Sequence, residues 1–240
     1  AFDRRVAQRL DGEPIQYVVG RWGFRSLDLF VDRRVLIPRP ETEVVAGLAI
    51  DEVRRLAGAR SQTGLPSDVV VADLGCGSGA IGLSVAAEVG DVDVWLTDVS
   101  VDAVAVARAN LTGLGVRGRR TRIGIGSWFE ALPADLRGSL DVLVSNPPYI
   151  ASSERLDPAV AQWEPADALF SGSTGTEALE HIVDQAAAWL AADGALVLEM
   201  APTQTEEISR RAAAAFADVE VMNDLAGRPR AVVARRGGAS

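Results

Sequence analysis

Residues 69–79, VVVADLGCGSG, predict a buried strand that turns sharply into a helix. Residues 69–73 form a short apolar run, and residues 80–89 have the periodicity of a helix. Alternate glycines between the two allow a tight turn and a close approach of the backbone to a ligand, and the helix start offers free N–H groups. Nucleotide sites and simple tight turns share this pattern, so the neighbouring segments have to distinguish them.

Strand and helix patterns alternate along most of the chain. We expect strands at 69–73, 92–98, 121–126, 140–145, 195–200, 219–223 and 231–235, and helices at 80–89, 101–114, 177–192 and 205–216, with an insertion at 150–174. Alternating units of this kind predict a doubly wound α/β fold with a mostly parallel, seven-stranded, Rossmann-like sheet. The last two strands have no helix between them, which predicts an antiparallel edge strand.

The N-terminal part predicts a small appendage of helix and β-hairpin. Helical spacing at 1–10 places Phe2, Val6 and Leu10 on one face, and 22–24 and 27–31 read as hairpin strands. A helix is expected from Glu43 to about Gly58 with Thr42 as its N-cap, followed by a polar linker at 60–68.

Composition and charge exclude several classes of function. The net charge of −9 and the pI near 4.7 disfavour a large nucleic-acid surface, so we expect no direct nucleic-acid partner. The arginines at 117–122 are better explained as a solvated loop than as a binding patch. No stretch reaches the roughly 18 to 20 apolar residues of a membrane span, and residues 1–5, AFDRR, lack the apolar core of a signal peptide. We expect a cytoplasmic monomer without membrane contact.

The residue types present limit the chemistry. Cys76 is the single cysteine and His181 the single histidine, which excludes an intrachain disulfide and a Cys/His zinc cluster, and no metal site is expected. All 24 cationic side chains are arginines, so a P-loop lysine or a Schiff base is also excluded. Carboxylates, amides, hydroxyls or a cofactor must carry any reaction.

A second motif, SNPPY at 145–149, follows the apolar run 140–144. It is therefore expected at the carboxyl end of a strand, where open α/β sheets bind ligands. Two prolines fix φ and remove two backbone donors, leaving a stiff turn with carbonyls free to accept. The Asn146 side chain, these carbonyls and the Tyr149 ring could hold a planar NH2 group. A proline-rich turn capped by asparagine fits the motif equally well.

Asp98 ends the second strand, about twenty residues beyond the glycine-rich turn. A carboxylate at this place can accept both hydroxyls of a ribose, although Asp98 could instead cap the helix at 101–114. The spacing Gly-x-Gly-x-Gly lacks the last glycine of the dinucleotide fingerprint. An adenosine cofactor without a pyrophosphate fits better than NAD.

These motifs carry a family resemblance. Residues 73–79 resemble motif I of class I S-adenosylmethionine-dependent methyltransferases, and NPPY at 146–149 resembles the amino-methylating motif of that class. EPIQYVVG at 13–20 and LIPRPETE at 36–43 narrow the resemblance to the protein N5-glutamine methyltransferases that modify peptide chain release factors. Shorter matches at 164–165, 168–169 and 227–230 extend it along nearly the whole chain.

The resemblance implies a cofactor site and its residues. S-adenosylmethionine would be bound by Gly75, Cys76, Gly77, Ser78, Gly79, Asp98, Trp128 and Asn146. The glycines would line its methionine and ribose parts, Asp98 would hold the ribose hydroxyls, and Trp128 would flank the adenine. Without the resemblance, Trp128 would be interpreted as an ordinary core tryptophan.

The resemblance also implies the reaction: methyl transfer to the side-chain nitrogen of a glutamine, most plausibly in the Gly-Gly-Gln loop of a release factor, with S-adenosylhomocysteine as product. Asn146 and Pro147 would each accept one N–H of that nitrogen, Tyr149 would pack against the amide, and Pro148 would complete the substrate contact. Such an enzyme acts in translation termination. Glu41 and Glu43 are candidates for lining the pocket, or simply partners of a helix dipole.

Two other functions stay open. The same tetrapeptide serves exocyclic adenine nitrogens, so an amino-methyltransferase on nucleic acid is one alternative, and a ribosomal-protein glutamine is another substrate. A non-catalytic module that keeps only the cofactor pocket is a different class.

Family members usually carry an N-terminal helical domain, so residues 1–40 are interpreted as the remnant of a substrate-recognition module and 41–240 as the methyltransferase domain. Ala201-Pro202 departs from the family pattern and predicts a changed turn there.

Overall fold

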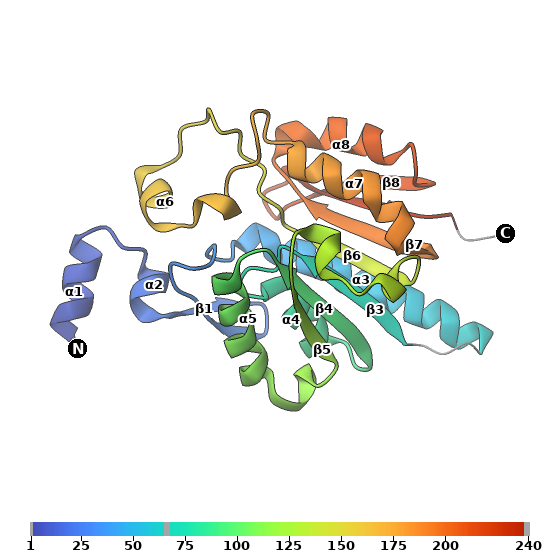
Figure 1. The fold of residues 1–240 in the computed structure, drawn as a ribbon, viewed down its shortest axis with the longest axis horizontal. Coiled ribbons are helices and arrows are strands. Elements are labelled where there is room, and N and C mark those ends of the chain that lie inside the picture. The colour runs from blue at the N-terminus through green and yellow to red at the C-terminus, as the bar shows by residue number, and fades with distance from the viewer. Residues whose placement is uncertain (1, 65–67, 238–240) are drawn as a thin grey trace.

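A seven-stranded sheet forms the centre of the molecule in the computed structural model, which describes residues 2–64 and 68–237. Its strand order is β5-β4-β3-β6-β7-β9-β8 (Figure 1). The strands are β3 (Val69–Leu74), β4 (Val92–Asp98), β5 (Thr121–Ile125), β6 (Leu140–Ser145), β7 (Leu190–Glu199), β8 (Asp218–Asn223) and β9 (Pro229–Arg235). The pairs from β5 to β7 are parallel, and β9 is antiparallel to both β7 and β8. The predicted doubly wound fold with its antiparallel edge is confirmed.

Helices cover both faces of this sheet because its central strands are apolar on both sides. Val71 of β3 belongs to one buried cluster, whereas Ala72 and Leu74 belong to another. The first cluster includes residues of α3 (Pro40–Thr63), α4 (Ala80–Glu88) and α5 (Val101–Leu114), and the second includes residues of α7 (Glu177–Trp189) and α8 (Thr205–Ala212). The result is a three-layer sandwich (Figure 1).

The sheet reverses its winding between β3 and β6. The chain proceeds outward from β3 to β4 and β5, then returns to place β6 on the other side of β3. Leu74 pairs with Ser145 at the carboxyl ends of these two strands, and the Ser145 hydroxyl donates to the Leu74 carbonyl at 2.6 Å. The glycine-rich turn and the NPPY motif therefore begin side by side at the position where such sheets bind ligands.

The appendage contains α1 (Phe2–Leu10), α2 (Ile15–Val19) and a hairpin of β1 (Arg21–Phe24) and β2 (Leu27–Phe30). The hairpin was predicted from the sequence, whereas α2, a helix of only five residues, was not. Phe2, Val6 and Leu10 of α1 are exposed. The appendage is joined to the rest of the fold by the segment between β2 and α3.

Helix α3 differs most from the sequence prediction. It begins at Pro40, whose fixed φ suits the first turn, with Arg39 as N-cap, so the prediction of Thr42 as the cap is wrong. It continues to Thr63 and ends at Gly64, which has a φ of 73°. Arg60 is paired with Asp141 of β6, which anchors this end to the sheet where a linker was expected. Part of that expected linker, 65–67, lies outside the described residues.

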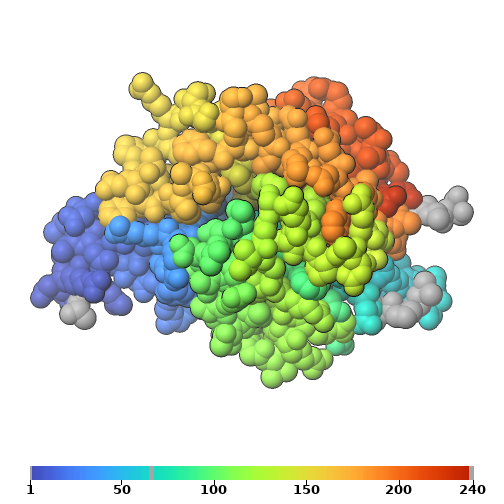
Figure 2. All heavy atoms as spheres, in the orientation of Figure 1, coloured from blue at the N-terminus to red at the C-terminus, as the bar shows by residue number. Residues whose placement is uncertain are grey.

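The insertion after β6 folds against the appendage. It contains the short helix α6 (Pro158–Trp163), which the sequence prediction did not include, and it lies beside the N-terminal segment in Figure 2. The Arg33 guanidinium lies 4.0 Å from the centre of the Trp163 ring, and Arg39 pairs with Glu164. In the described part of the chain, no helix is long and apolar enough to cross a membrane.

Candidate active site

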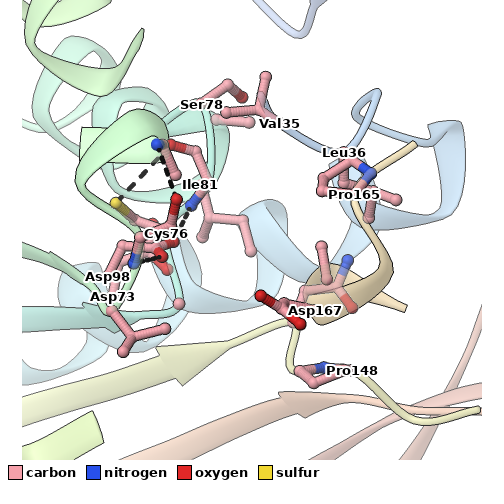
Figure 3. A pocket seen from close by; sticks show the side chains of 18 of the residues that line it. Val35, Leu36, Asp73, Cys76, Ser78, Ile81, Asp98, Pro148, Pro165 and Asp167 are labelled. Atoms are coloured by element: carbon pink, nitrogen blue, oxygen red, sulfur yellow. Dashed lines mark hydrogen bonds between the residues drawn. The ribbon is translucent and has the colours of Figure 1, made fainter. Parts of the chain in front are cut away.

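A cavity of about 220 Å³ opens at the switch point between β3 and β6. Figure 3 shows side chains of the turn after β3 on one side and those of Pro148, Pro165 and Asp167 on the other. We call the first side, Asp73 and residues 75–78 with Asp98 and Trp128, the donor wall. The second side, Thr42, Asn146 and Pro148 with Pro165, Asp167 and Ala168 of the insertion, is the acceptor wall.

The glycine-rich turn forms the donor wall through backbone geometry. Gly75, Gly77 and Gly79 have φ values of 68°, 55° and 83°, which side-chain-bearing residues rarely adopt. The Cys76 N–H donates to the Thr97 carbonyl at 2.9 Å and ties the turn to β4. Gly79 is the N-cap of α4 and packs towards Leu83. The turn thus brings backbone, with little side chain, to the edge of the cavity.

Asp98 lies at the end of β4 and faces this turn. Its two carboxylate oxygens accept the N–H groups of Gly77 and Ser100, each at 2.9 Å. Desolvation raises the pKa of Asp98 in spite of these bonds. The cap of α5 is Ser100, whose hydroxyl accepts from Ala103, so the alternative interpretation of Asp98 as that cap is wrong. The remaining lone pairs of Asp98 are free for hydroxyl donors.

Asp73 is a donor-wall residue for which the sequence analysis had no role. Its side chain is 1% exposed and lines the cavity. One oxygen accepts the Gly82 N–H at 2.8 Å, and the other has no hydrogen-bond partner among the described residues. Desolvation raises the pKa of Asp73 to about 7. An unpaired buried carboxylate of this kind fits a cationic group such as the ammonium of a bound amino acid. Its position near the end of β3, two residues before the first glycine, was the available signal.

Trp128 follows β5 and leans over the turn. Its φ is 46°, a strained value for a tryptophan. A Cβ atom added to Gly75 would lie 3.5 Å from Cζ3 of the Trp128 ring. This ring is 6.4 Å from the His181 ring. Trp128 lines the cavity and is not enclosed in the core. This position is compatible with the prediction that Trp128 flanks the adenine, which stays a prediction.

The NPPY motif contributes to the acceptor wall unequally. Asn146 and Pro148 line the cavity, whereas the buried Pro147 and the phenol of Tyr149 are not part of the lining. The Asn146 amide donates to the Thr42 hydroxyl at 3.3 Å. The Tyr149 carbonyl accepts from Gln204 at 2.9 Å, so it is occupied, although the sequence suggested carbonyls free to accept. The roles assigned to Pro147 and Tyr149 stay predictions.

Other predicted residues have structural partners. Glu41 pairs with Arg228, and Glu43 accepts the Arg25 N–H, so neither lines the cavity. The sequence analysis assigned no site role to Pro165, Asp167 and Ala168, which line the cavity from the insertion after β6. Glu164 brings them there, because it accepts the Ile37 N–H at 3.1 Å and pairs with Arg39.

Comparison with known proteins identifies the class first. The family model described as "Methyltransferase small domain" matches residues 61–163. The structure resembles the T. thermophilus 16S rRNA N2 G1207 methyltransferase, solved in complex with AdoMet and guanosine, with a TM-score of 0.60 and 15% identity over 90% of this chain and 50% of that one. The fold is that of class I methyltransferases.

Relatives at higher identity narrow this class. The release factor glutamine methyltransferase of Gloeobacter violaceus is 37% identical over 96% of this chain and 76% of its own length. That of Mycolicibacterium smegmatis is also 37% identical, over 98% of this chain and 79% of its own. This chain therefore belongs to the release factor glutamine methyltransferase family, as the resemblance in its motifs implied.

Proposed function

We propose that this methyltransferase transfers a methyl group from S-adenosylmethionine to the side-chain nitrogen of a glutamine in a peptide chain release factor. The observation that carries the proposal is that Asn146 lines the same cavity as Asp73 and Asp98. A donor site and an amide-binding side chain thus share one cavity. Family membership supports the release factor as the substrate.

The donor wall fits the cofactor by its chemistry. Asp98 has lone pairs for the two ribose hydroxyls, and the unpaired oxygen of Asp73 can accept from the methionine ammonium. Trp128 and the exposed Val99 offer apolar surface for the adenine. Bound there, the cofactor supplies an activated methyl group on a sulfonium, which requires no metal for its transfer.

The acceptor wall orients the substrate amide. A glutamine nitrogen is a poor nucleophile because its lone pair is delocalised into the carbonyl group. If the Asn146 oxygen accepts one N–H and the Pro147 carbonyl the other, the nitrogen is held with its lone pair towards the methyl group. Orientation of this kind can lower a barrier by about 7 to 11 kcal/mol. Methyl transfer releases one proton from the nitrogen, and the products are the N5-methyl amide and S-adenosylhomocysteine.

The two parts of the chain have different roles in this proposal. We assign residues 1–40 to the substrate side and 41–240 to methyl transfer. Arg34, Val35, Leu36 and Pro38 of the first part line the cavity. The pair between Arg39 and Glu164 connects this segment to the insertion that completes the acceptor wall.

Methyl transfer from labelled S-adenosylmethionine tests the function directly. We expect label in a release factor and none in its variant with Gln→Ala in the Gly-Gly-Gln loop. Mass spectrometry of the peptide with that glutamine should show one added methyl group. Equal labelling of the two release factors would refute the proposal, and label in nucleic acid instead would favour the alternative substrate class.

A further inference from the structure

Asn146 of the acceptor wall lies beside the end of β7, because Ser145 pairs with Leu198, and Thr42 of the same wall bonds to Asn146. Asn146 follows β6, Thr42 lies in the first turn of α3, and Glu199 ends β7. The Asn146 amide nitrogen donates to the Thr42 hydroxyl, and hydrogen bonding with the Thr42 and Tyr149 side chains lowers the pKa of Glu199. Thr42, Asn146 and Glu199 together lead from the cavity to the interior, and we call them the polar path.

Glu199 is enclosed and does not reach the cavity itself. It is 1% exposed, is not part of the cavity lining, and its Oε2 atom has no hydrogen-bond partner among the described residues. Desolvation raises the pKa of Glu199 to about 7, and the charged groups that act on it are Arg230, which lowers the pKa, and Glu41, which raises it. A carboxyl group kept here at such a desolvation cost can affect the substrate only through its neighbours.

The hydroxyl group of Thr42 connects the two ends of this path. A hydroxyl has one proton to donate, and a carboxylate is acceptor-only. When Thr42 donates to Glu199, only its lone pairs remain for Asn146, and the NH2 end of the amide is the end that can use them. The oxygen of Asn146 then faces away from Thr42.

We propose that Thr42 and Glu199 are positioning residues that fix the orientation of the Asn146 amide, so that its oxygen faces the substrate nitrogen. This proposal rests on the proposed function. It also assigns specificity, because an oxygen at this position accepts from the NH2 group of glutamine and repels the carboxylate of glutamate.

Thr42→Val is the sharpest test, since it keeps the shape of the side chain and removes the hydroxyl. We expect kcat for release factor methylation to fall about tenfold, the size of one lost hydrogen bond. Thr42→Ser should restore turnover because it restores the hydroxyl. Cofactor affinity, measured by calorimetric titration, should stay within about twofold of the original. A Thr42→Val enzyme with unchanged kcat would overturn the proposal.

Discrimination between glutamine and glutamate separates positioning from simple packing. In Thr42→Val the Asn146 amide is free to turn its NH2 group towards the cavity. The affinity for a release factor with Gln→Glu in its loop, relative to the original release factor, should therefore rise about tenfold. An unchanged ratio would mean that Thr42 does not set the orientation.

Glu199→Gln provides a second variant of nearly the same shape. In the original enzyme the carboxylate is the stronger acceptor for Thr42, so kcat should rise between about pH 6 and 8, and the variant should lose this rise. A rise that persists in the variant would exclude Glu199 from the path. The outcomes are distinguishable: an original enzyme that leaves the release factor unlabelled refutes the function, whereas labelling that is insensitive to Thr42→Val refutes the positioning.

Discussion

The two walls of the cavity are constructed in different ways. The donor wall consists largely of backbone from residues adjacent in sequence, bent by Gly75 and Gly77 and tied to Asp98. The acceptor wall consists of side chains from α3, β6 and the insertion, and its contact between Thr42 and Asn146 joins residues 104 positions apart. Binding the cofactor thus depends on local sequence, whereas orienting the substrate depends on tertiary packing. Substitutions in the two walls should accordingly change different measurable quantities.

Asn146→Ala should have the largest effect on turnover and should leave the cofactor site of the donor wall intact. Loss of the amide oxygen removes the acceptor for the substrate nitrogen, and we expect kcat to fall about 1000-fold, as on removal of a preorganised hydrogen-bonding group. Cofactor affinity measured by titration should be largely kept, because the donor wall is intact. Asn223→Ala, at an exposed position of β8, is the matched control and should leave both quantities unchanged. Retained turnover in Asn146→Ala would contradict the assignment.

The difference between the walls also explains what the sequence could predict. The strand–turn–helix around Gly77 and the carboxylate of Asp98 were predictable, because periodicity and backbone conformation are local properties. The role of Thr42 was not, since its pattern before a helix favoured an N-cap and its actual partner is remote in sequence. The lining contributed by Asp167 was missed for the same reason, because a 3-10 helix of three residues has no periodicity that would place it.

The turn after β7 extends this point. Ala201-Pro202 departs from the family pattern, which predicted a changed turn. In the structure the Ala201 N–H donates to the Gln204 side chain at 3.0 Å, and Gln204 donates in turn to the Tyr149 carbonyl at 2.9 Å. A side chain thereby fixes the end of the NPPY motif, and only the tertiary structure shows the connection.

Glu199→Gln, behind the acceptor wall, should change how the free energy of unfolding depends on pH. Burial raises the pKa of Glu199 from its usual 4.5 to about 7, so the folded state holds a proton that the unfolded chain releases between these values. This contribution to the free energy of unfolding is fully present below about pH 4.5 and is lost as the pH rises to about 7.

Urea unfolding at a series of pH values measures this contribution. The glutamine cannot ionise, so the variant should lose about 3 kcal/mol of the decline in the free energy of unfolding over that interval. Asp73, whose pKa is also raised to about 7, should still cause part of the decline in the free energy of unfolding in the variant. Glu130→Gln at an exposed position serves as the control. An identical decline in Glu199→Gln and the original protein would show that Glu199 is already ionised when folded.

Asp98→Asn should weaken the donor wall without affecting the acceptor wall. The amide has one acceptor atom in place of two and opposes an N–H group of Gly77 or Ser100 with its own NH2 group. We expect the Kd for S-adenosylmethionine to rise about 100-fold, the loss of two bonds to a charged acceptor. At saturating cofactor kcat should be nearly unchanged. Asp135→Asn, at an exposed position of the short 3-10 helix Ala134–Leu136, is the control, and unaltered cofactor affinity in Asp98→Asn would remove Asp98 from the site.

Gly79→Ala tests whether the glycine-rich turn that holds the donor wall depends on its backbone conformation. Gly79 has a φ of 83°, and an added Cβ would lie 2.9 Å from Cδ1 of Leu83. A left-handed alanine costs about 1 to 2 kcal/mol, so the free energy of unfolding in urea should fall by that amount. Gly58→Ala is the matched control, because Gly58 lies in α3, is exposed and has open space around its Cα.

The control should stabilise the protein by about 0.5 to 1 kcal/mol through helix propensity alone. Opposite signs for the same chemical change would show that the requirement for glycine at 79 arises from the conformation of the turn. Equal effects at 58 and 79 would instead mean that the turn can relax to accept a side chain. In that case the donor wall would owe its shape to contacts such as the bond between Asp98 and Gly77, and the two walls would differ less than their sequences indicate.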